Sequence, residues 1–239
     1  MITPWFEELD YVESPMGPLI LQRRRIAALN NQDVYEVKLN DEYLMSSLFH
    51  DAEVALSQLV LEQTKGAVLD IVVGGLGLGY TAAAALQDPR VHHLTIVEAL
   101  APVIDWHQRR IVPNGKTLTK DPRCQYLHGD FFALARSTGF APDIPGKTVD
   151  AILLDIDHTP QLLLSEAHAD FYTAEGLTSF ARFLKPGGIF GLWSNEPPDT
   201  EFLTRLETVF GQAEGHTITF PNPMQNTTST NGIYRARKA

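Results

Sequence analysis

The sequence has little of several features that mark particular classes of protein. Cys124 is the one cysteine in 239 residues, which excludes a disulfide within the chain and a cysteine-rich zinc site. Long apolar runs are absent, and the first residues are acidic and aromatic, not basic and then apolar. We therefore expect neither a membrane span nor a signal peptide, and a cytoplasmic location.

Basic side chains are scarce, since 19 Lys and Arg stand against 29 Asp and Glu, a formal net charge of −10. A nucleic acid or an anionic membrane is therefore not the expected partner, and a small cation fits this balance better. The short basic run QRRR, residues 22–25, lies inside β-like sequence. We interpret it as a solvated strand edge, not as a nucleic-acid patch.

What the sequence does contain is a regular alternation of apolar strands and helices. Residues 17–48 carry short β-like runs, and helical spacing then begins near Asp51 and continues to Gly66. Beyond it, runs that are apolar on both faces, such as AVLDIVV and HLTIVEA, alternate with helical segments. This alternation predicts a mostly parallel sheet with helices on both sides. The last β-like runs, HTITFPN and GIYRARK, predict an antiparallel edge hairpin with QNTTSTN as its loose tip.

We therefore predict an α/β fold of the Rossmann-like, doubly wound type. Its main sheet is expected to have seven strands, mostly parallel, and to end in the C-terminal antiparallel hairpin. The length suits one main domain with a small appendage. We assign residues 1–50 to a small N-terminal β unit and residues 51–239 to the main domain.

The first core strand is followed by a turn that is rich in glycine. The stretch VVGGLGLGYT contains Gly74, Gly75, Gly77 and Gly79. Glycines let the backbone turn sharply and let a ligand approach it, while the helix that follows directs free N–H groups at the ligand. Taken alone, the motif also fits a turn that is tight only for packing.

Acidic residues at the ends of the next strands favour ligand binding. Glu98 ends the second core strand, where a nucleotide-binding sheet places an acid that accepts from ribose hydroxyls. Asp130 is positioned either to accept from an adenine amino group or to cap the next helix. Asp155 ends a further strand. Because ligands of open parallel sheets bind at the carboxyl ends of the strands, these residues predict a nucleoside site.

In these motifs the chain resembles the spermidine synthase family, which is built on the fold of class I S-adenosylmethionine-dependent methyltransferases. The resemblance runs from YEVKLNDEYLMSS to GLWSN and includes GGLGLG, TIVEA, DPRCQYLHGD, ADFYTAEGL and LKPGGIF. It implies transfer of an aminopropyl group from decarboxylated S-adenosylmethionine to a small amine, without a metal. A homodimer is implied as well, since that is the usual state of proteins in this family. The resemblance also implies that the glycines flank the nucleoside, Glu98 holds ribose, Asp130 holds adenine and Asp155 receives the proton of the attacking amine.

Two positions depart from the family pattern. Leu76 and Leu78 occupy the turn where the family has an acid for the donor's ammonium, and His158 stands where it has a second acid for the diamine. Asp157 is the neighbouring acid that would substitute. Fewer carboxylates leave a buried ammonium unpaired, which favours unmodified S-adenosylmethionine or a less cationic acceptor. The alternatives are therefore a methyltransferase, or another transferase that uses this donor on a small molecule, and a non-catalytic nucleoside-binding module.

The segment DIDHTP also offers three side chains for acid–base or metal chemistry: Asp155, Asp157 and His158. Alternating side-chain directions disfavour a shared metal, so we expect none, and His158 is either a proton acceptor or an ordinary loop histidine. Other candidates for the acceptor pocket lie near the same edge, with core packing as the alternative for the aromatic ones: Tyr172, Trp193 and Ser194.

Overall fold

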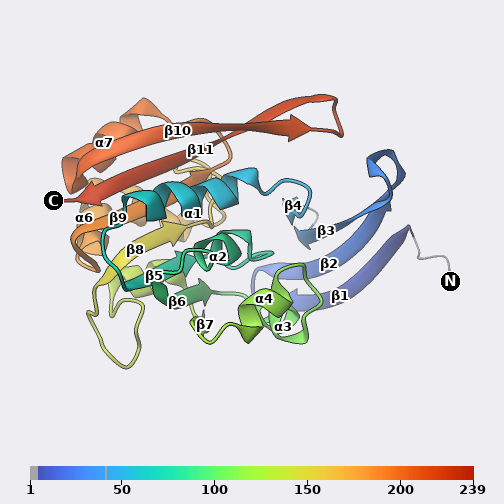
Figure 1. Ribbon diagram of the computed structural model, residues 1–239, viewed down its shortest axis with the longest axis horizontal. Helices are drawn as coiled ribbons and strands as arrows, with labels where there is room; N and C mark the ends of the chain where they lie inside the picture. Colours follow the sequence, from blue (N-terminus) through green and yellow to red (C-terminus); the bar gives the residue numbers. More distant parts are fainter. Residues whose placement is uncertain (1–4, 41) are drawn as a thin grey trace.

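The computed structural model describes residues 5–40 and 42–239, which form a smaller and a larger β-sheet (Figure 1). The smaller sheet is antiparallel, and its strands lie side by side in sequence order. They are β1 (Phe6–Ser14), β2 (Gly17–Ile26), β3 (Gln32–Leu39) and β4 (Glu42–Ser46), with a 3-10 turn, Ala27–Leu29, between β2 and β3. The predicted N-terminal β unit is thus present, with two strands, β1 and β4, that the sequence pattern does not reveal.

The larger sheet has seven strands within the described residues, in the order β10-β11-β9-β8-β5-β6-β7. Strands β5 to β9 run parallel, and β11 runs antiparallel to both β9 and β10. The strands are β5 (Leu69–Gly74), β6 (Val91–Glu98), β7 (Cys124–His128), β8 (Val149–Leu154), β9 (Leu184–Ser194), β10 (Gly211–Asn222) and β11 (Thr227–Lys238). This arrangement confirms the predicted doubly wound, mostly parallel sheet with its C-terminal hairpin.

Successive side chains of the central strands face two different helical layers. On β5, Ile71 and Val73 join one buried cluster and Val72 joins the other, which is why these strands are apolar throughout. The first layer contains α1 (Asp51–Gln63), α2 (Tyr80–Ala85), α3 (Ala101–Arg109) and α4 (Gly115–Lys120). The second contains α5 (Phe131–Arg136), α6 (Ala174–Ala181) and α7 (Thr200–Phe210), and a 3-10 segment, Glu166–Tyr172, precedes α6. None of the helices in the described part of the chain has the length and apolar character to span a bilayer.

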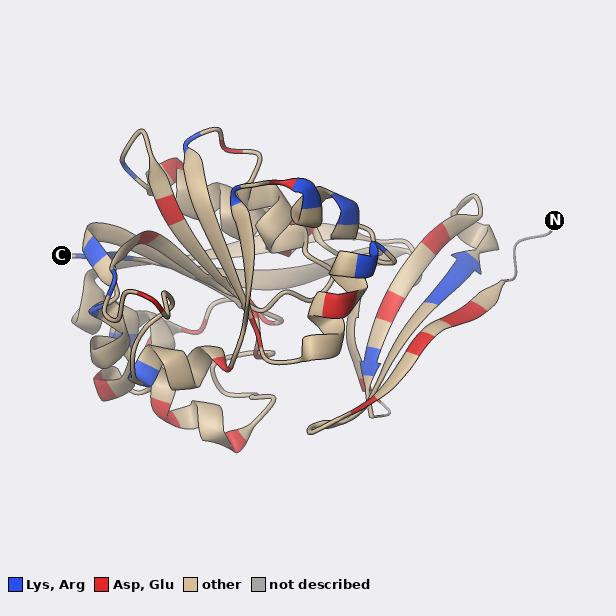
Figure 2. Ribbon diagram, turned by 90° about the horizontal axis from the view of Figure 1, so that it is seen from below, with Lys and Arg blue, Asp and Glu red and all other residues tan. Residues whose placement is uncertain are grey.

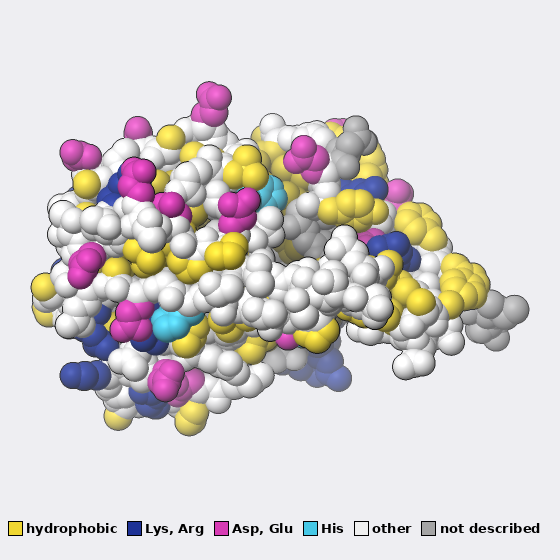
Figure 3. Space-filling model, turned by 90° about the horizontal axis from the view of Figure 1, so that it is seen from above, with side chains coloured by type: hydrophobic (Ala, Val, Ile, Leu, Met, Phe, Trp, Pro, Cys, Tyr) yellow, Lys and Arg dark blue, Asp and Glu magenta, His cyan; other side chains and the backbone are white. Residues whose placement is uncertain are grey.

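The smaller sheet buries one face against the first helical layer. Leu19, Leu21, Val37 and Leu39 belong to the same buried cluster as β5 and α1. Exposed hydrophobic side chains of this part of the chain are Trp5, Phe6, Tyr11, Met16 and Tyr43. Figure 3 shows hydrophobic side chains at the surface toward the N-terminal end. Because the two sheets share one cluster, the small sheet is fixed over the main one, and the domain boundary at residue 50 stays a prediction.

Two details of the sequence interpretation are wrong. The tip of the hairpin is shorter than QNTTSTN, since residues 227–231 pair with residues 218–222 and extend the hairpin as an arm beyond β9, toward the small sheet (Figure 1). The basic run is not at a strand edge, because β2 lies between β1 and β3. Its arginines form ion pairs with acids of the neighbouring strands: Arg23 with Glu7, Arg24 with Glu36 and Arg25 with Asp33. Figure 2 shows acidic and basic residues side by side on the strands of the small sheet.

Candidate functional site

Two adjoining cavities lie at the carboxyl ends of β5, β6 and β8, where the small sheet meets the large one. Cavity A has a volume of about 280 Å³ and is lined by Gly75, Glu98, Asp130 and Phe132, among others. Cavity B has a volume of about 480 Å³, and its lining extends from α1 and α2 to the arm of β10 and β11. The two share a boundary made of Leu44, Met45, Gly77, Asp155, Ile156 and Leu164.

The glycine turn between β5 and α2 forms part of both walls. At Gly75, with φ +93°, a Cβ would lie 2.0 Å from the backbone oxygen of Asp155, so a side chain there would collide with the chain that carries the acid. At Gly77 a Cβ would meet the Met45 sulfur of β4 instead. Gly79 lines cavity B. Gly75 and Gly77 are therefore bare because backbone and sheet approach them closely, whereas a Cβ at Gly79 would meet the side chains of Leu118 and His107.

Gly74 does not line either cavity. A Cβ at this position would meet the ring of Phe131 at 2.5 Å, so the glycine makes room for α5 and not for a ligand. The packing alternative thus describes Gly74 in the structure, and its role in binding a cofactor stays a prediction.

Side chains of α3 and the following segment hold the carbonyls of the turn. The Nε2 atom of His107 lies 2.9 Å from the Gly77 oxygen, and Asn114 Nδ2 donates to the Leu78 oxygen at 3.0 Å. Burial lowers the pKa of His107 to about 4, so its ring is neutral and Nε2–H is the donor. Because these carbonyls are tied back, the turn keeps one conformation.

Glu98 and Asp130 lie along cavity A as predicted, and both also bind the backbone. Glu98 accepts from the N–H groups of Leu76 and Leu100, at 3.0 and 2.8 Å, and burial raises its pKa. Asp130 caps α5 by accepting from Phe132 N and Ala133 N, both through Oδ1. The capping alternative is therefore observed for Asp130, while its position in the cavity wall is kept. Each carboxylate retains lone pairs for a ligand.

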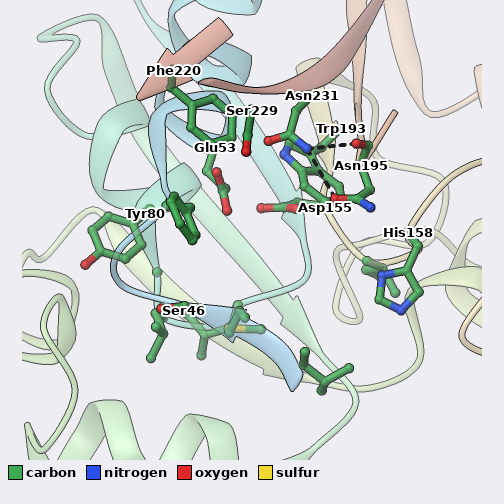
Figure 4. Close-up of a pocket in the computed structure, with 18 of the residues that line it drawn as sticks. Ser46, Glu53, Tyr80, Asp155, His158, Trp193, Asn195, Phe220, Ser229 and Asn231 are labelled. Atoms are coloured by element: carbon green, nitrogen blue, oxygen red, sulfur yellow. Dashed lines mark hydrogen bonds between the residues drawn. The ribbon is translucent and has the colours of Figure 1, made fainter. Parts of the chain in front are cut away.

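The central feature of cavity B is a pair of acids, one of which, Asp155, also lines cavity A. Asp155 accepts from Thr81 Oγ1 at 2.7 Å, and Glu53, in the first turn of α1, faces it across cavity B (Figure 4). Burial raises the pKa of both groups, and the charge of Asp155 raises the pKa of Glu53 further. Both shifts favour the protonated form, so the pair tends to keep one proton near neutral pH.

Asp157 is not at the site. Its carboxylate is buried and accepts from Leu164 N at 2.8 Å, from Tyr172 OH at 2.9 Å and from His168 Nδ1 at 2.9 Å. Neither Asp157 nor Tyr172 lines either cavity in the described structure. The assignment of Asp157 as catalytic and of Tyr172 to the substrate pocket stays a prediction, which the position of these side chains does not support. Asp157 holds the loop that carries His168, and His168 stacks on Phe132 in the wall of cavity A.

We expect Asp157→Asn to reduce stability more than chemistry. An amide donates where Asp157 now only accepts, which leaves a buried group mismatched and lowers the free energy of unfolding by about 2 kcal/mol. Urea unfolding measures this loss. Asp170→Asn, an exposed acid of the same loop, is the control and should unfold like the wild type. A variant that is as stable as the wild type but inactive would restore Asp157 to the catalytic set.

The remaining predicted residues divide between the cavity and its support. His158 and Trp193 both line cavity B, whereas Ser194 is buried beside it and accepts from Glu196 N. The placement of Ser194 in the substrate pocket stays a prediction, because its neighbours Trp193 and Asn195 line cavity B and Ser194 itself does not. The three residues of DIDHTP do not converge, and within the described residues no group of His, Cys, Asp or Glu is arranged to hold a metal ion.

Sequence reasoning missed Glu53, His168 and the residues of the hairpin arm. Glu53 sits in a helical pattern whose first turn is acidic, which is an ordinary helix start. Phe220, Ser229 and Asn231 lie far along the chain from the strand ends and reach cavity B only because the arm extends over it. No local signal marks either contribution.

No protein-family model matches the chain. Three solved structures are similar to it: a spermidine synthase in complex with the transition-state analogue AdoDATO, the spermidine synthase of Thermotoga maritima and a probable spermidine synthase of Corynebacterium glutamicum. Their TM-scores are 0.70, 0.69 and 0.64, with 16%, 16% and 17% identity. The alignments cover 97%, 97% and 98% of this chain and 74%, 73% and 81% of those chains.

The chain has the spermidine synthase fold. The likeness includes the small N-terminal sheet, because it covers nearly the whole chain. It thus agrees with the resemblance found in the sequence motifs, while the residues that line the cavities are this chain's own.

Proposed function

We propose that the protein is a transferase that binds decarboxylated S-adenosylmethionine in cavity A and transfers its aminopropyl group to a small amine in cavity B. The observation that carries this proposal is the position of Asp155. Its carboxylate stands on the boundary of both cavities, opposite Glu53 and within hydrogen-bond reach of Thr81.

Cavity A suits the nucleoside part of the donor. Its walls are mostly apolar, with Val97, Leu100, Val103 and Phe132 among them, as a flat adenine ring requires. Glu98 is available to the ribose hydroxyls, and Asp130 to the adenine amino group. The glycine turn leads from this cavity to the boundary, where the sulfonium end of the donor would meet Asp155.

The charges of the lining support the decarboxylated donor. Among the described residues, neither cavity has Lys or Arg in its lining, whereas Glu53, Glu98, Asp130 and Asp155 all take part. The carboxylate of unmodified S-adenosylmethionine would thus enter an acidic site with no cation to compensate it. An ammonium is favoured there, and the acceptor amine in cavity B meets both Glu53 and Asp155.

The donor supplies an activated carbon, because the sulfonium leaves as a neutral thioether. The acceptor nitrogen uses its lone pair to form the new N–C bond while the C–S bond breaks and its electron pair goes to sulfur. Asp155 accepts the proton that the nitrogen loses, and Thr81 holds the carboxylate in place. No metal takes part in this proposal.

The proposal is tested first by calorimetry. We expect decarboxylated S-adenosylmethionine to bind at least about tenfold more tightly than the parent compound, since the parent adds an unpaired carboxylate. Glu98→Gln should weaken the binding of methylthioadenosine as well as that of the donor, because Glu98 is proposed to contact the nucleoside, which both molecules share. Tighter binding of unmodified S-adenosylmethionine, with methylated product detected by mass spectrometry, would establish a methyltransferase instead. Binding without any product would point to the non-catalytic module.

A further inference from the structure

Cavity A contains a histidine that takes no part in the proposed proton transfer. His168, in the 3-10 segment before α6, lines this cavity, and its ring stacks on the ring of Phe132, with the centroids 3.9 Å apart and the planes at 23°. Only 13% of its side chain is exposed. The imidazole is thus held in one position in the wall of the proposed donor site.

Asp157 determines which nitrogen of this imidazole carries the hydrogen. Nδ1 of His168 lies 2.9 and 3.1 Å from the two carboxylate oxygens of Asp157, which is buried and also accepts from Leu164 N and Tyr172 OH. Because an ionised carboxylate only accepts, Nδ1 is the donor. In the neutral ring Nε2 then carries a lone pair and no hydrogen, and none of the described residues donates to it.

A second acceptor belongs to the same part of the cavity wall. Asp130 caps α5 through Oδ1 alone, which accepts from Phe132 N and Ala133 N, while Oδ2 accepts from none of the described residues. Phe132 therefore connects the two polar groups, since its backbone binds Asp130 and its ring stacks on His168. Both groups line cavity A, and a ligand group there that donates two hydrogen bonds finds two acceptors.

We propose that His168 is a specificity-determining residue for the base of the donor. Its Nε2 accepts one hydrogen of the exocyclic amino group of adenine, and the free oxygen of Asp130 accepts the other. This inference rests on the proposed function and specifies how the same site selects its nucleoside. In hypoxanthine an oxygen replaces the amino group, so lone pairs would face lone pairs and neither hydrogen bond would form.

A matched set of nucleosides tests the base selection by calorimetry. The probes are methylthioadenosine, its analogue with a purine base that lacks the amino group, and methylthioinosine. Titrations at about pH 8.5 keep an imidazole neutral. We expect the wild type to bind methylthioadenosine at least about 30-fold more tightly than the analogue without the amino group, and methylthioinosine to bind more weakly still.

A variant isolates the contribution of Nε2. In His168→Asn the amide nitrogen takes the place of Nδ1 and donates to Asp157, whereas nothing replaces Nε2. The amino group then loses one of its two acceptors, so the preference for methylthioadenosine over the analogue without the amino group should shrink by about fivefold. Tyr172→Phe is the control, because it removes a donor to Asp157 from outside the cavity. It should lower Tm and keep the wild-type preference.

The outcomes distinguish this inference from the function on which it rests. A wild type that binds methylthioinosine as tightly as methylthioadenosine overturns the role of His168 while donor binding still stands, and this measurement needs no variant. The role is also overturned if folded His168→Asn keeps the full preference, or if Tyr172→Phe loses as much of it, since the position of the loop and not Nε2 would then set the selection. If neither methylthioadenosine nor decarboxylated S-adenosylmethionine binds, the proposed function fails, and this inference fails with it.

Discussion

Replacing Asp155 with Asn is expected to lower kcat by about 10³-fold while the protein still folds and binds its donor. The amide keeps the shape of the side chain, and its oxygen still accepts from Thr81 Oγ1. What it loses is the ability to take a proton from the attacking amine. Donor affinity should fall far less than turnover, because the nucleoside contacts in cavity A are unchanged.

Single-turnover kinetics with the purified variant, together with donor calorimetry and thermal unfolding, measure these three quantities separately. Thr81→Val is a useful companion, since it leaves the carboxylate in place and removes only its hydrogen bond. Thr81→Val should lower kcat by about tenfold. If Asp155→Asn turns over at the wild-type rate, proton transfer from the amine does not depend on this carboxylate, and the mechanism proposed here is wrong.

The sequence predicted the parts of the site that lie at the ends of strands. A strand buried on both faces is recognised by its composition, and the position just after it is fixed by the parallel sheet. Glu98, Asp130 and Asp155 were found in this way, and all of them line the cavities. The glycine motif does not show which of its glycines packs against α5, as Gly74 does.

Asp157 lies beyond the end of a strand, where the sequence pattern does not give the direction of a side chain. β8 ends at Leu154, so Asp157 belongs to the segment that follows it. The partners of Asp157 come from His168 and Tyr172, in a 3-10 segment whose position in space the local pattern does not give. β1 was missed for a related reason, since a register shift between Glu8 and Asp10 interrupts its alternation.

Glu53 is the largest gap in the sequence interpretation, and its replacement by Gln has the second largest expected effect. Binding of a cationic amine between two acids favours the ionised form of both. Without Glu53 the amine meets one carboxylate only, so we expect its KM to rise about 30-fold with a smaller change in kcat. Steady-state kinetics with saturating donor measure this. A fall in kcat alone would contradict the assigned role.

The same variant makes a prediction about stability and pH. Burial and the charge of Asp155 raise the pKa of Glu53 from 4.5 to about 8 in the folded protein. The folded state therefore holds a proton that the unfolded chain has released, so this group's contribution to stability is complete below about pH 4.5 and is lost as the pH rises through about 8.

Glutamine does not ionise, so Glu53→Gln should match the wild type in Tm at pH 5 and exceed it at pH 9. Glu62→Gln, an exposed glutamate of the same helix, should show no such difference between the two pH values. An equal Tm offset for Glu53→Gln at pH 5 and pH 9 would mean that Glu53 is ionised at both, and the acid pair would then not share a proton.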